Sequence, residues 1–244
     1  MLEHLTQLYR QETGQVATNE LLFDLQWQAQ PLSSNVNRGP GQWLILGDRG
    51  DLGITIAKNL EAQHHHCFII PFESEDDTVY DLDLRLGQIV QNDQLPFHGV
   101  IFARGWGETL GDDSPNLDWQ QQLRPDFSIL IYLVKKLYQF LGQSPKLWLV
   151  TQQAKAIAGH GIRINLNHAP LWGLGLTVAV EYADLWGGLI DLDLTGSVAE
   201  AAAQICQEIL QTPETTQVAY RSGTRYLPHL QRSPGAPSPP IARS

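Results

Sequence analysis

The sequence predicts an α/β fold, because short apolar runs alternate along the chain with longer stretches of helical periodicity. Runs that are apolar throughout are typical of strands buried on both faces, and such strands are joined by right-handed helical crossovers. A glycine-punctuated turn follows the first of these runs, and Ser222-Gly223 separates two short strand-like runs near the end. Together these observations predict a doubly wound, mostly parallel sheet of Rossmann type with helices on both faces and a C-terminal hairpin.

The predicted elements follow one another as strand and helix from residue 43 onward. Strands are expected over 43–46, 67–70, 99–103, 147–150 and 188–192, helices over 51–63, 81–91, 117–141, 170–182 and 197–210, and the two hairpin strands over 217–220 and 225–227. Pro125 is expected to kink or restart the third helix, and Pro170 to lie in the first turn of the fourth. Ser197 and Glu200 have the spacing of a capping box at the start of the last helix.

The regular alternation is flanked by two segments of different character. Residues 1–42 are predicted to form an N-terminal segment with a short helix over 1–10 and a strand over 21–27. Residues 43–231 form the predicted α/β domain, and residues 232–244 are a Pro-rich linker or tail. A linker of this composition predicts that the domain is part of a larger polypeptide.

Composition and charge exclude several classes of function. Apolar residues make up 43% of the 244 residues, enough for a sizeable core, and the formal net charge is −10. This charge argues against a sequence-independent nucleic-acid binder, which needs a basic surface to displace counterions from phosphates. The N-terminus does not read as a signal peptide, and no apolar stretch approaches the roughly 20 residues of a membrane span. Cys67 and Cys206 are expected to be reduced core residues, so we expect a cytoplasmic protein without nucleic-acid or membrane partners.

The turn after the first buried strand lies where a dinucleotide-binding fold places the pyrophosphate of its cofactor. In short-chain dehydrogenases this turn is rich in glycine, but two of those glycines are aspartates in this chain. A carboxylate of Asp51 at the helix start is expected to cap the amides that would otherwise bind phosphate, and to repel the anion. We therefore expect a degenerate loop that binds no cofactor, with the alternative that Arg49 offsets this charge and accepts a 2′-phosphate. The loop consists of Gly47, Asp48, Arg49, Gly50, Asp51, Leu52 and Gly53.

The residues of short-chain reductase chemistry are missing at the expected places. That chemistry needs a tyrosine to protonate the carbonyl oxygen, a lysine four residues later to lower the tyrosine pKa, and a serine at the preceding strand end. The helix that begins near His168 has no such pair, because Tyr182 lies at its far end and Lys155 precedes it. Thr151 and His168 are the polar substitutes, and their spacing supports no triad. We therefore predict no catalytic residue in this chain.

Several other polar or aromatic residues have an ordinary structural interpretation. Residues 64–66 are three consecutive histidines, whose side chains would alternate between the faces of a strand, so we expect no metal site. Asp191 and Asp193 share one face at the carboxyl end of a strand, where α/β proteins often bind ligands, but two carboxylates alone specify no chemistry. Residues 73–77 are expected to be a solvated acidic loop. Three tryptophans expected to serve packing or an interface are Trp106, Trp172 and Trp186.

Two specific motifs are Pro-Leu-Trp-Gly-Leu-Gly over residues 170–175 and Trp-Gly-Gly-Leu-Ile-Asp over residues 186–191. With residues 22–27 and 217–226, the stretches that contain these motifs closely resemble the structural subdomain of ketoreductases in type I polyketide synthases. The resemblance spans about residues 20 to 230 in the correct order. It departs from the family at Leu176, where the family commonly has arginine, and we expect a weaker contact with the partner domain there.

The resemblance implies a two-part enzyme of which this chain is the first part. In the family, a truncated Rossmann-like N-terminal half binds no cofactor and stabilises a C-terminal half, which binds NADPH and reduces the β-ketoacyl group on an acyl carrier protein. The implied partners are the catalytic ketoreductase subdomain, other polyketide synthase domains and the acyl carrier protein. In fully reducing modules an enoylreductase can follow the structural half, which suits the Pro-rich tail.

Two alternative functions stay open at this point. One is an independent NADP-dependent reductase of short-chain type with an atypical loop, and nucleotide titration separates it from a structural half. The other is a pseudo-ketoreductase scaffold beside a methyltransferase. Only the neighbouring sequence would distinguish it from the structural half of an active ketoreductase.

The stretch from Leu171 to Gly188 is a candidate contact with a second Rossmann-like domain. A glycine in a helix costs roughly 1 kcal/mol relative to alanine, which is understandable where another backbone or a bulky ring must approach. Two interpretations carry equal weight: Gly173 and Gly175 admit a partner, or they fit the helix against its own sheet. The candidate interface residues are Leu171, Trp172, Gly173, Gly175 and Trp186.

Overall fold

The structure is a computed structural model. It describes residues 22–32, 39–47, 50–71, 78–91, 95–106, 119–139, 145–160, 164–193, 196–211 and 217–233. The chain divides into two compact units, a larger one of Ala29–Leu227 and a smaller one of Met1–Gln28 with Pro228–Ser244. The predicted domain boundaries after residues 42 and 231 stay a prediction.

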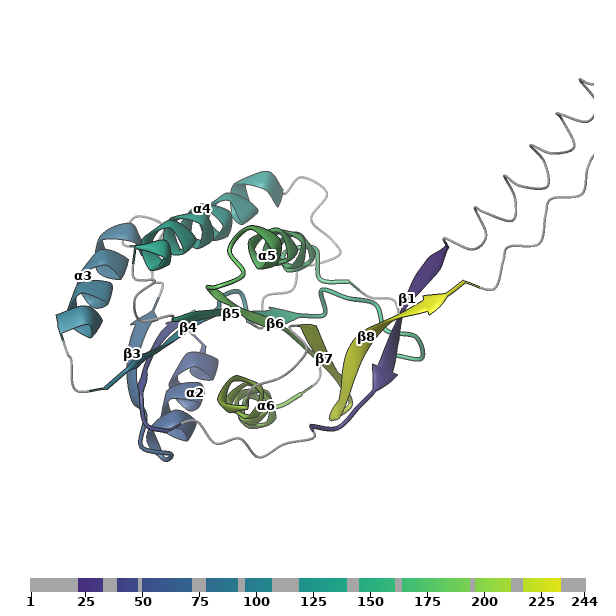
Figure 1. The fold of residues 1–244 in the computed structure, drawn as a ribbon, viewed down its shortest axis with the longest axis horizontal. Coiled ribbons are helices and arrows are strands. Elements are labelled where there is room, and N and C mark those ends of the chain that lie inside the picture. Colours follow the sequence, from purple (N-terminus) through teal and green to yellow (C-terminus); the bar gives the residue numbers. More distant parts are fainter. Residues whose placement is uncertain are drawn as a thin grey trace, which may run out of the picture. The chain divides into compact units, whose positions relative to one another are not determined.

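A mostly parallel sheet forms the centre of the larger unit (Figure 1). Its strands are β2 (Gln42–Gly47), β3 (His66–Pro71), β4 (Phe97–Ala103), β5 (Lys146–Gln152), β6 (Trp186–Leu192), β7 (Gln217–Arg221) and the first four residues of β8 (Thr224–Arg232). From Pro228 onward β8 belongs to the smaller unit. The strands run in the order β8-β7-β6-β5-β4-β2-β3, with parallel pairing from β3 to β7 and an antiparallel pair of β7 and β8. The predicted fold class and the C-terminal hairpin are confirmed.

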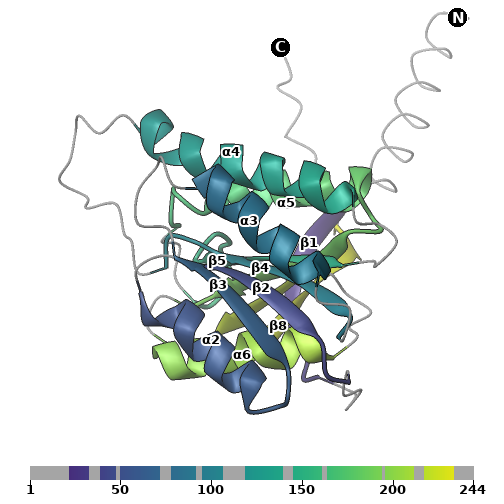
Figure 2. The same ribbon diagram turned by 90° about the vertical axis from the view of Figure 1, so that its left-hand side faces the viewer.

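Helices cover both faces of this sheet (Figure 2). On one face lie α2 (Asp51–Glu61) and α6 (Val198–Leu210), and on the other α3 (Thr78–Gln91), α4 (Trp119–Tyr138) and α5 (Ala169–Glu181). The helix α4 runs through Pro125 without a break, so this proline does not restart it. The hydrogen bond that a proline removes is offset by the following turns, whose Ile129, Leu130, Leu133 and Leu137 are buried. Among the described residues no helix is both long enough and apolar enough to cross a membrane.

The helices α2 and α6 pack against one face of the sheet and form a buried core with it. Each helix buries apolar residues at a spacing of three or four, which places them on the side that faces the sheet. A fully buried Leu or Ile side chain stabilises the fold by about 1.5–3 kcal/mol. The buried cluster includes Ile56, Leu60, Ile205 and Ile209 from the helices and Ile45, Ile101, Trp148 and Ile190 from the strands.

The helix ends agree with the signals in the sequence. In α6 the Ser197 Oγ accepts the backbone N–H of Glu200 at 3.2 Å, and the Glu200 Oε2 accepts the backbone N–H of Ser197 at 3.0 Å. This is the predicted capping box. Pro170 lies in the first turn of α5, also as predicted.

The smaller unit is described over residues 22–28 and 228–233. It contains most of β1 (Phe23–Ala29), which neighbours β8 in the strand order, and the Ser233 N–H donates to the Leu22 carbonyl at 2.9 Å. The strand begins two residues later than predicted and leaves large apolar side chains exposed, Phe23 and Leu25 among them. The predicted helix over 1–10 and the Pro-rich tail from 234 onward lie outside the described residues.

Candidate functional site

The glycine turn after β2 leads the chain directly into α2. A Cβ atom on Gly47 would lie 3.5 Å from the Cα of Gly53, so strand and helix approach closely at this turn. Gly50 is the N-cap and Asp51 is the first helical residue, which corrects the capping role predicted for Asp51. The extended backbone that an N-cap needs belongs to Gly50 (φ −79°, ψ 166°). The exposed Asp51 carboxylate still lies in the first turn, where its charge interacts with the helix dipole and disfavours phosphate. Asp48 and Arg49 lie outside the described residues.

A buried carboxylate occupies the carboxyl ends of β5, β6 and β7. Asp191 of β6 is fully buried and forms an ion pair with Arg221 of β7, with 2.5 Å between Oδ2 and Nη2. The Asp191 carboxylate also accepts the Thr151 hydroxyl at 2.7 Å. It further accepts the backbone N–H groups of Ala154 at 2.8 Å and Lys155 at 3.1 Å. We call these five residues the Asp191 network; both oxygens of the carboxylate are engaged inside the protein.

Arg221 extends this network to the backbone. Its guanidinium donates to the carbonyl oxygens of Tyr220 and Lys155, each at 2.7 Å, and of Asp191 at 3.2 Å. The loop after β5 is thereby fastened to β6 and β7. Asp193 is engaged separately, because its Oδ2 accepts the Ser222 N–H at 2.8 Å. The two aspartates that share a strand face therefore have different partners, and sequence reasoning missed Arg221 as the partner of the first.

The polar substitutes for a reductase triad serve the fold. Thr151 is committed to Asp191, and His168 is buried with its Nδ1 accepting the Gln152 N–H at 2.7 Å. Tyr182 follows the last turn of α5, and its ring meets that of Tyr138 edge-on, with 5.8 Å between ring centroids. Thr151, His168 and Tyr182 therefore have separate partners, and the backbone of Lys155 is held by the Asp191 network.

A second buried ion pair ties the hairpin to α6. The Glu208 carboxylate accepts Arg225 Nε at 2.5 Å and Nη2 at 3.2 Å, and it accepts the Tyr220 hydroxyl at 2.6 Å. All three side chains are buried. Burial and the adjacent Glu208 charge raise the pKa of Tyr220, so the phenol stays protonated and donates. Sequence reasoning missed this network too, because its members lie on three different elements, α6, β7 and β8.

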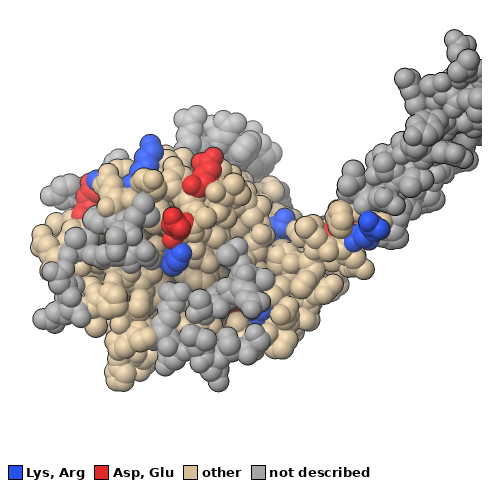
Figure 3. Space-filling model, in the orientation of Figure 1, with Lys and Arg blue, Asp and Glu red and all other residues tan. Residues whose placement is uncertain are grey.

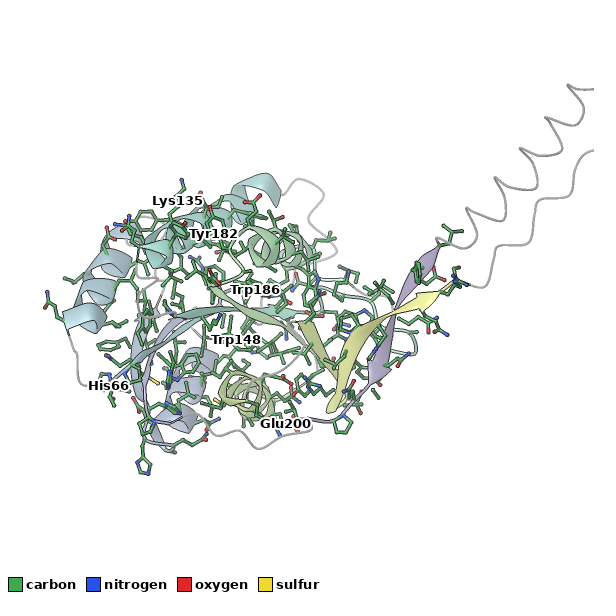
Figure 4. All side chains as sticks on the ribbon, in the orientation of Figure 1. His66, Lys135, Trp148, Tyr182, Trp186 and Glu200 are labelled. Atoms are coloured by element: carbon green, nitrogen blue, oxygen red, sulfur yellow. The ribbon has the colours of Figure 1, made fainter. Side chains whose placement is uncertain are left out.

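His64 and His65 lie between α2 and β3. His65 is buried, its Nδ1 accepts the Gly41 N–H at 3.2 Å, and its ring packs against those of Trp43 and His98. Burial lowers the pKa of His65, and the neighbouring His98 lowers it further. His66 begins β3 (Figure 4). Over the described ranges, His, Cys, Asp and Glu form no group of three that could hold a metal ion.

Both cysteines are free thiols, Cys206 buried and Cys67 partly buried. Burial raises the pKa of each to about 12. A thiol that stays protonated is a poor nucleophile and a poor metal ligand, so both act as apolar packing residues. The acidic stretch at 73–77 lies outside the described residues.

The candidate interface residues fall into two groups. Leu171, Trp172 and Trp186 are buried in the larger unit itself. Gly175 also faces this core, since a Cβ there would lie 2.9 Å from side-chain atoms of both Leu149 and Leu189. Gly173 differs, because it is exposed and a Cβ there would meet no atom within 4 Å. The two interpretations of the helix glycines therefore separate: Gly175 fits α5 to its own sheet, and Gly173 leaves open space outside.

The outer surfaces of α4 and α5 form a shallow groove of about 140 Å³. Its lining includes Ile131 and Val134 of α4, Thr177 and Val178 of α5, and Tyr182. Figure 4 shows Lys135 of α4 and Tyr182 on the same side of the sheet. The exposed apolar side chains of these helices are Ile131 at 45%, Tyr138 at 56%, Leu176 at 38% and Val180 at 83%. We call this surface the α4/α5 face; its groove is also lined by the charged residues Lys135 and Glu181, and Figure 3 shows both blue and red side chains on the described surface.

Comparison with known proteins places this arrangement in a family context. Residues 132–230 match the family model described as polyketide synthase extender module SpnB, Rossmann fold domain. A phenolphthiocerol/phthiocerol polyketide synthase from Mycobacterium tuberculosis is 43% identical over 95 residues, which cover 38% of this chain and 6% of the relative. Phthioceranic/hydroxyphthioceranic acid synthase from Mycobacterium bovis is 23% identical over 222 residues, which cover 90% of this chain and 10% of the relative.

A solved C2-type ketoreductase from a modular polyketide synthase has the same fold, with a TM-score of 0.68 and 20% identity. The match covers 88% of this chain and 44% of the ketoreductase. The chain is similar to the Rossmann-like structural subdomain of polyketide synthase ketoreductases. The resemblance predicted from its motifs is confirmed. The chain spans a tenth or less of the length of these curated relatives, and less than half of the ketoreductase structure.

The segment that the family model matches contains several features described above. Residues 132–230 include α5 with both of its glycines, the Asp191 network and the Glu208 ion pair. The glycine turn at 47–53 lies outside that segment. The family model therefore matches the part of the chain that contains the internal networks and α5.

Proposed function

We propose that this chain is the non-catalytic structural half of a β-ketoacyl reductase in a polyketide synthase. It supports a second Rossmann-like half, which binds NADPH and reduces the substrate. The observation that carries the proposal is the extent of the match: the chain corresponds to 44% of a ketoreductase, the proportion expected of one half. An isolated half has value if it holds the other half in place, and this assigns the chain a binding function.

The use of the polar groups at the carboxyl edge supports the proposal that this chain has no catalytic activity of its own. Thr151 occupies the strand end at which a short-chain reductase needs its serine, and its hydroxyl donates to the buried Asp191 carboxylate. A hydroxyl committed in this way cannot polarise a substrate carbonyl without breaking a buried hydrogen bond, which costs about 1–3 kcal/mol. The Asp51 carboxylate at the start of α2 further disfavours NADPH, because it meets the cofactor phosphates with like charge.

The α4/α5 face is the part of this chain that best fits a partner domain. It exposes four large apolar side chains on two adjacent helices, and solvent-exposed apolar patches of this kind commonly mark protein interfaces. The open space beside Gly173 permits a close approach of a helix or a bulky ring. We therefore place the contact with the catalytic half on α4 and α5.

The test of the binding function is co-expression with the catalytic ketoreductase half from the same pathway. We expect the two halves to co-purify and to raise each other's melting temperature. Val180→Asp should abolish or weaken association by at least tenfold, since it buries a charge at the contact. Ile54→Asp is the matched control, because Ile54 is 45% exposed on α2, on the other face of the sheet. Failure of the unaltered halves to associate, or equal loss with both variants, would contradict the proposal.

The test of the missing chemistry is titration of the isolated chain with NADPH by calorimetry at physiological salt. We expect no binding in the micromolar range and no NADPH oxidation with a β-ketoacyl thioester. Replacing both Asp48 and Asp51 by glycine frees the helix amides and is expected to create at most weak nucleotide affinity, without turnover. Turnover by the unaltered chain would instead support an independent reductase.

A further inference from the structure

The described part of the smaller unit is a two-stranded ribbon, made of most of β1 and the end of β8. Just after β1, the Gln30 N–H donates to the Arg225 carbonyl near the start of β8 at 3.0 Å. Just after β8, the Ser233 N–H donates to the Leu22 carbonyl, which precedes β1, at 2.9 Å. The two strands are therefore antiparallel, and these hydrogen bonds set their register.

The two faces of this ribbon differ in character. In the register set by the hydrogen bonds, Leu25 of β1 lies opposite Leu230 of β8, on one face. Phe23 shares that face and is 54% exposed, while Leu25 is 50% and Leu230 74% exposed. The opposite face is polar along β1, where it carries Asp24 and Gln26. We call the apolar surface the ribbon face; its members are Phe23, Leu25 and Trp27 of β1 and Pro228, Leu230 and, at its end, Arg232 of β8.

The ribbon face has the size of a single element of secondary structure. A two-stranded ribbon is at best marginally stable in water, so exposed apolar side chains on it indicate a surface that another element covers. With the seven residues of β1, the face measures roughly 24 Å by 10 Å, or about 240 Å². Each partner in a stable protein–protein interface buries about 800 Å², so this face alone is too small to hold a second copy of the chain.

Residues 1–10 have a sequence pattern that matches this face. At about 100° per residue of a helix, all the apolar residues of this segment fall within an arc of about 120°, and every other residue is polar. A helix of this length is about 15 Å long and 10 Å wide, so its apolar stripe fits within the ribbon face. It is also too short to be stable in water without an apolar surface to pack on. The apolar stripe consists of Met1, Leu2, Leu5, Leu8 and Tyr9.

The chain between this segment and β1 is long enough to bring the two together. Residues 11–21 can extend to about 36 Å, which exceeds the length of the ribbon face. They are mostly polar and include Gly14 and Asn19, which favour turns. The Pro-rich stretch of residues 234–244 fits the face less well, since Ile241 is its one large aliphatic side chain.

We propose that residues 1–10 form an amphipathic helix that packs its apolar stripe on the ribbon face of the same chain. Helix and ribbon stabilise each other, because each by itself leaves apolar side chains in water. The contact lies within one chain. The proposal therefore depends neither on a ketoreductase role nor on the α4/α5 face.

The first measurement is amide hydrogen exchange, followed by NMR, in the 244-residue chain. The N–H groups of residues 5–10 have acceptors within the proposed helix, so they should exchange at least tenfold more slowly than in a free peptide of residues 1–12. Leu230→Asp places a charge under the apolar stripe and should return these amides to the peptide rate. The matched control is Gln231→Asp, which places the same charge on the opposite face of β8 and should leave the exchange unchanged.

A second pair of variants changes the helix and leaves the ribbon intact. Leu5→Asp places a charge within the apolar stripe and should abolish the protection of residues 6–10. Gln7→Asp introduces the same residue on the polar side of the helix and should retain the protection. The Ser233 amide, which donates to Leu22, reports in each variant whether the ribbon stays paired. If Leu230→Asp separates the strands, the pair at residues 5 and 7 decides the outcome.

Exchange at the peptide rate in the unaltered chain would overturn the proposal. So would a control variant that loses as much protection as its partner. Protection that rises with protein concentration would mean that the helix packs on a second copy, and protection that disappears when residues 234–244 are removed would mean that the tail is part of the cover. Either result would overturn the assignment of the ribbon face to residues 1–10 of the same chain. None of these outcomes bears on association with a catalytic half.

Discussion

The carboxyl edge of the sheet and the α4/α5 face use their side chains in opposite ways. At the carboxyl edge, where α/β enzymes usually hold their ligands, the buried polar groups of β5, β6 and β7 bind one another. On the α4/α5 face, large apolar side chains stay exposed, with Val180 at 83%. Polar groups satisfied internally are lost to chemistry, whereas apolar groups left outside favour association. The contrast supports the proposal that this chain binds another domain.

The largest effect is expected from breaking the Asp191 network. Asp191→Ala leaves Arg221 as an unpaired buried charge and removes the acceptor for Thr151 and two backbone amides. The free energy of unfolding should fall by about 3–5 kcal/mol, measured by urea denaturation.

Two controls sharpen this result. Asp184→Ala removes an exposed acid in the turn before β6 and should change stability by less than about 0.5 kcal/mol. The double variant Asp191→Leu with Arg221→Met removes both charges and should recover part of the loss. If Asp191→Ala lowered the free energy of unfolding no more than Asp184→Ala does, the Asp191 network would not stabilise the carboxyl edge.

The next effect separates the two glycines of α5. Gly175→Leu forces a side chain into the space held by Leu149, Leu189 and Trp186, and should destabilise the chain by about 1–3 kcal/mol or more. Gly173→Leu meets open space and should leave the stability of the isolated chain unchanged or slightly raised. In co-purification with a catalytic half, however, Gly173→Leu should weaken association. Unfolding of the Gly173 variant would place this glycine in the core and remove it from the α4/α5 face.

Sequence periodicity predicted the elements well because each strand and helix is a local pattern. The positions of β4, α5 and β6, and the capping box of α6, follow from residues a few positions apart. The pairing of Asp191 with Arg221 joins residues 30 positions apart and depends on the register of β6 and β7, in which Asp191 lies opposite Ala219. No local pattern contains that register, so the partner could not be predicted.

The two glycines of α5 also show what a local sequence pattern cannot predict. Gly173 and Gly175 lie two residues apart in one motif, and the helix turns them to different sides. Which side faces the sheet depends on how α5 packs, and α5 is apolar nearly all around. Its sequence therefore has no clear buried stripe, and only the packed structure tells the inner glycine from the outer one.

A smaller loss of stability is expected at the start of α6, where the capping hydrogen bonds lie on the surface of the chain. Ser197→Ala removes the acceptor for the Glu200 N–H and should lower the free energy of unfolding by about 1 kcal/mol. Ser197→Asp is the control, since aspartate is an equally good N-cap, and should retain most of the stability. A larger loss in the aspartate variant than in the alanine variant would show that charge repulsion near Glu200 outweighs capping.

The smallest effect is a shallow dependence of stability on pH that comes from His65. It tests whether this buried side chain at the amino edge of the sheet is held by its hydrogen bond and its burial. The pKa of His65 is lowered in the folded state, mainly by burial and also by His98 from β4 and His64 from its own turn. The unfolded chain therefore binds the proton more readily, so this contribution to stability is complete above pH ~6.5 and is lost as the pH falls toward the folded pKa. Protonation also replaces the acceptor at Nδ1 that receives the Gly41 N–H.

The measurement is the melting temperature between about pH 8 and pH 5, with His65→Gln as the variant. The variant should be less stable at the upper end of this window, because the Gly41 hydrogen bond is perturbed, but its melting temperature should vary less with pH. The carboxyls of Asp83 and Glu200, whose pKa values are lowered by hydrogen bonds, lose their contribution only below pH ~4 and do not interfere. An equal pH slope in variant and unaltered chain would assign the dependence to another histidine. A flatter dependence of melting temperature on pH in the variant would show that its surroundings keep His65 neutral. The buried polar groups at the carboxyl edge are likewise fixed by their neighbours.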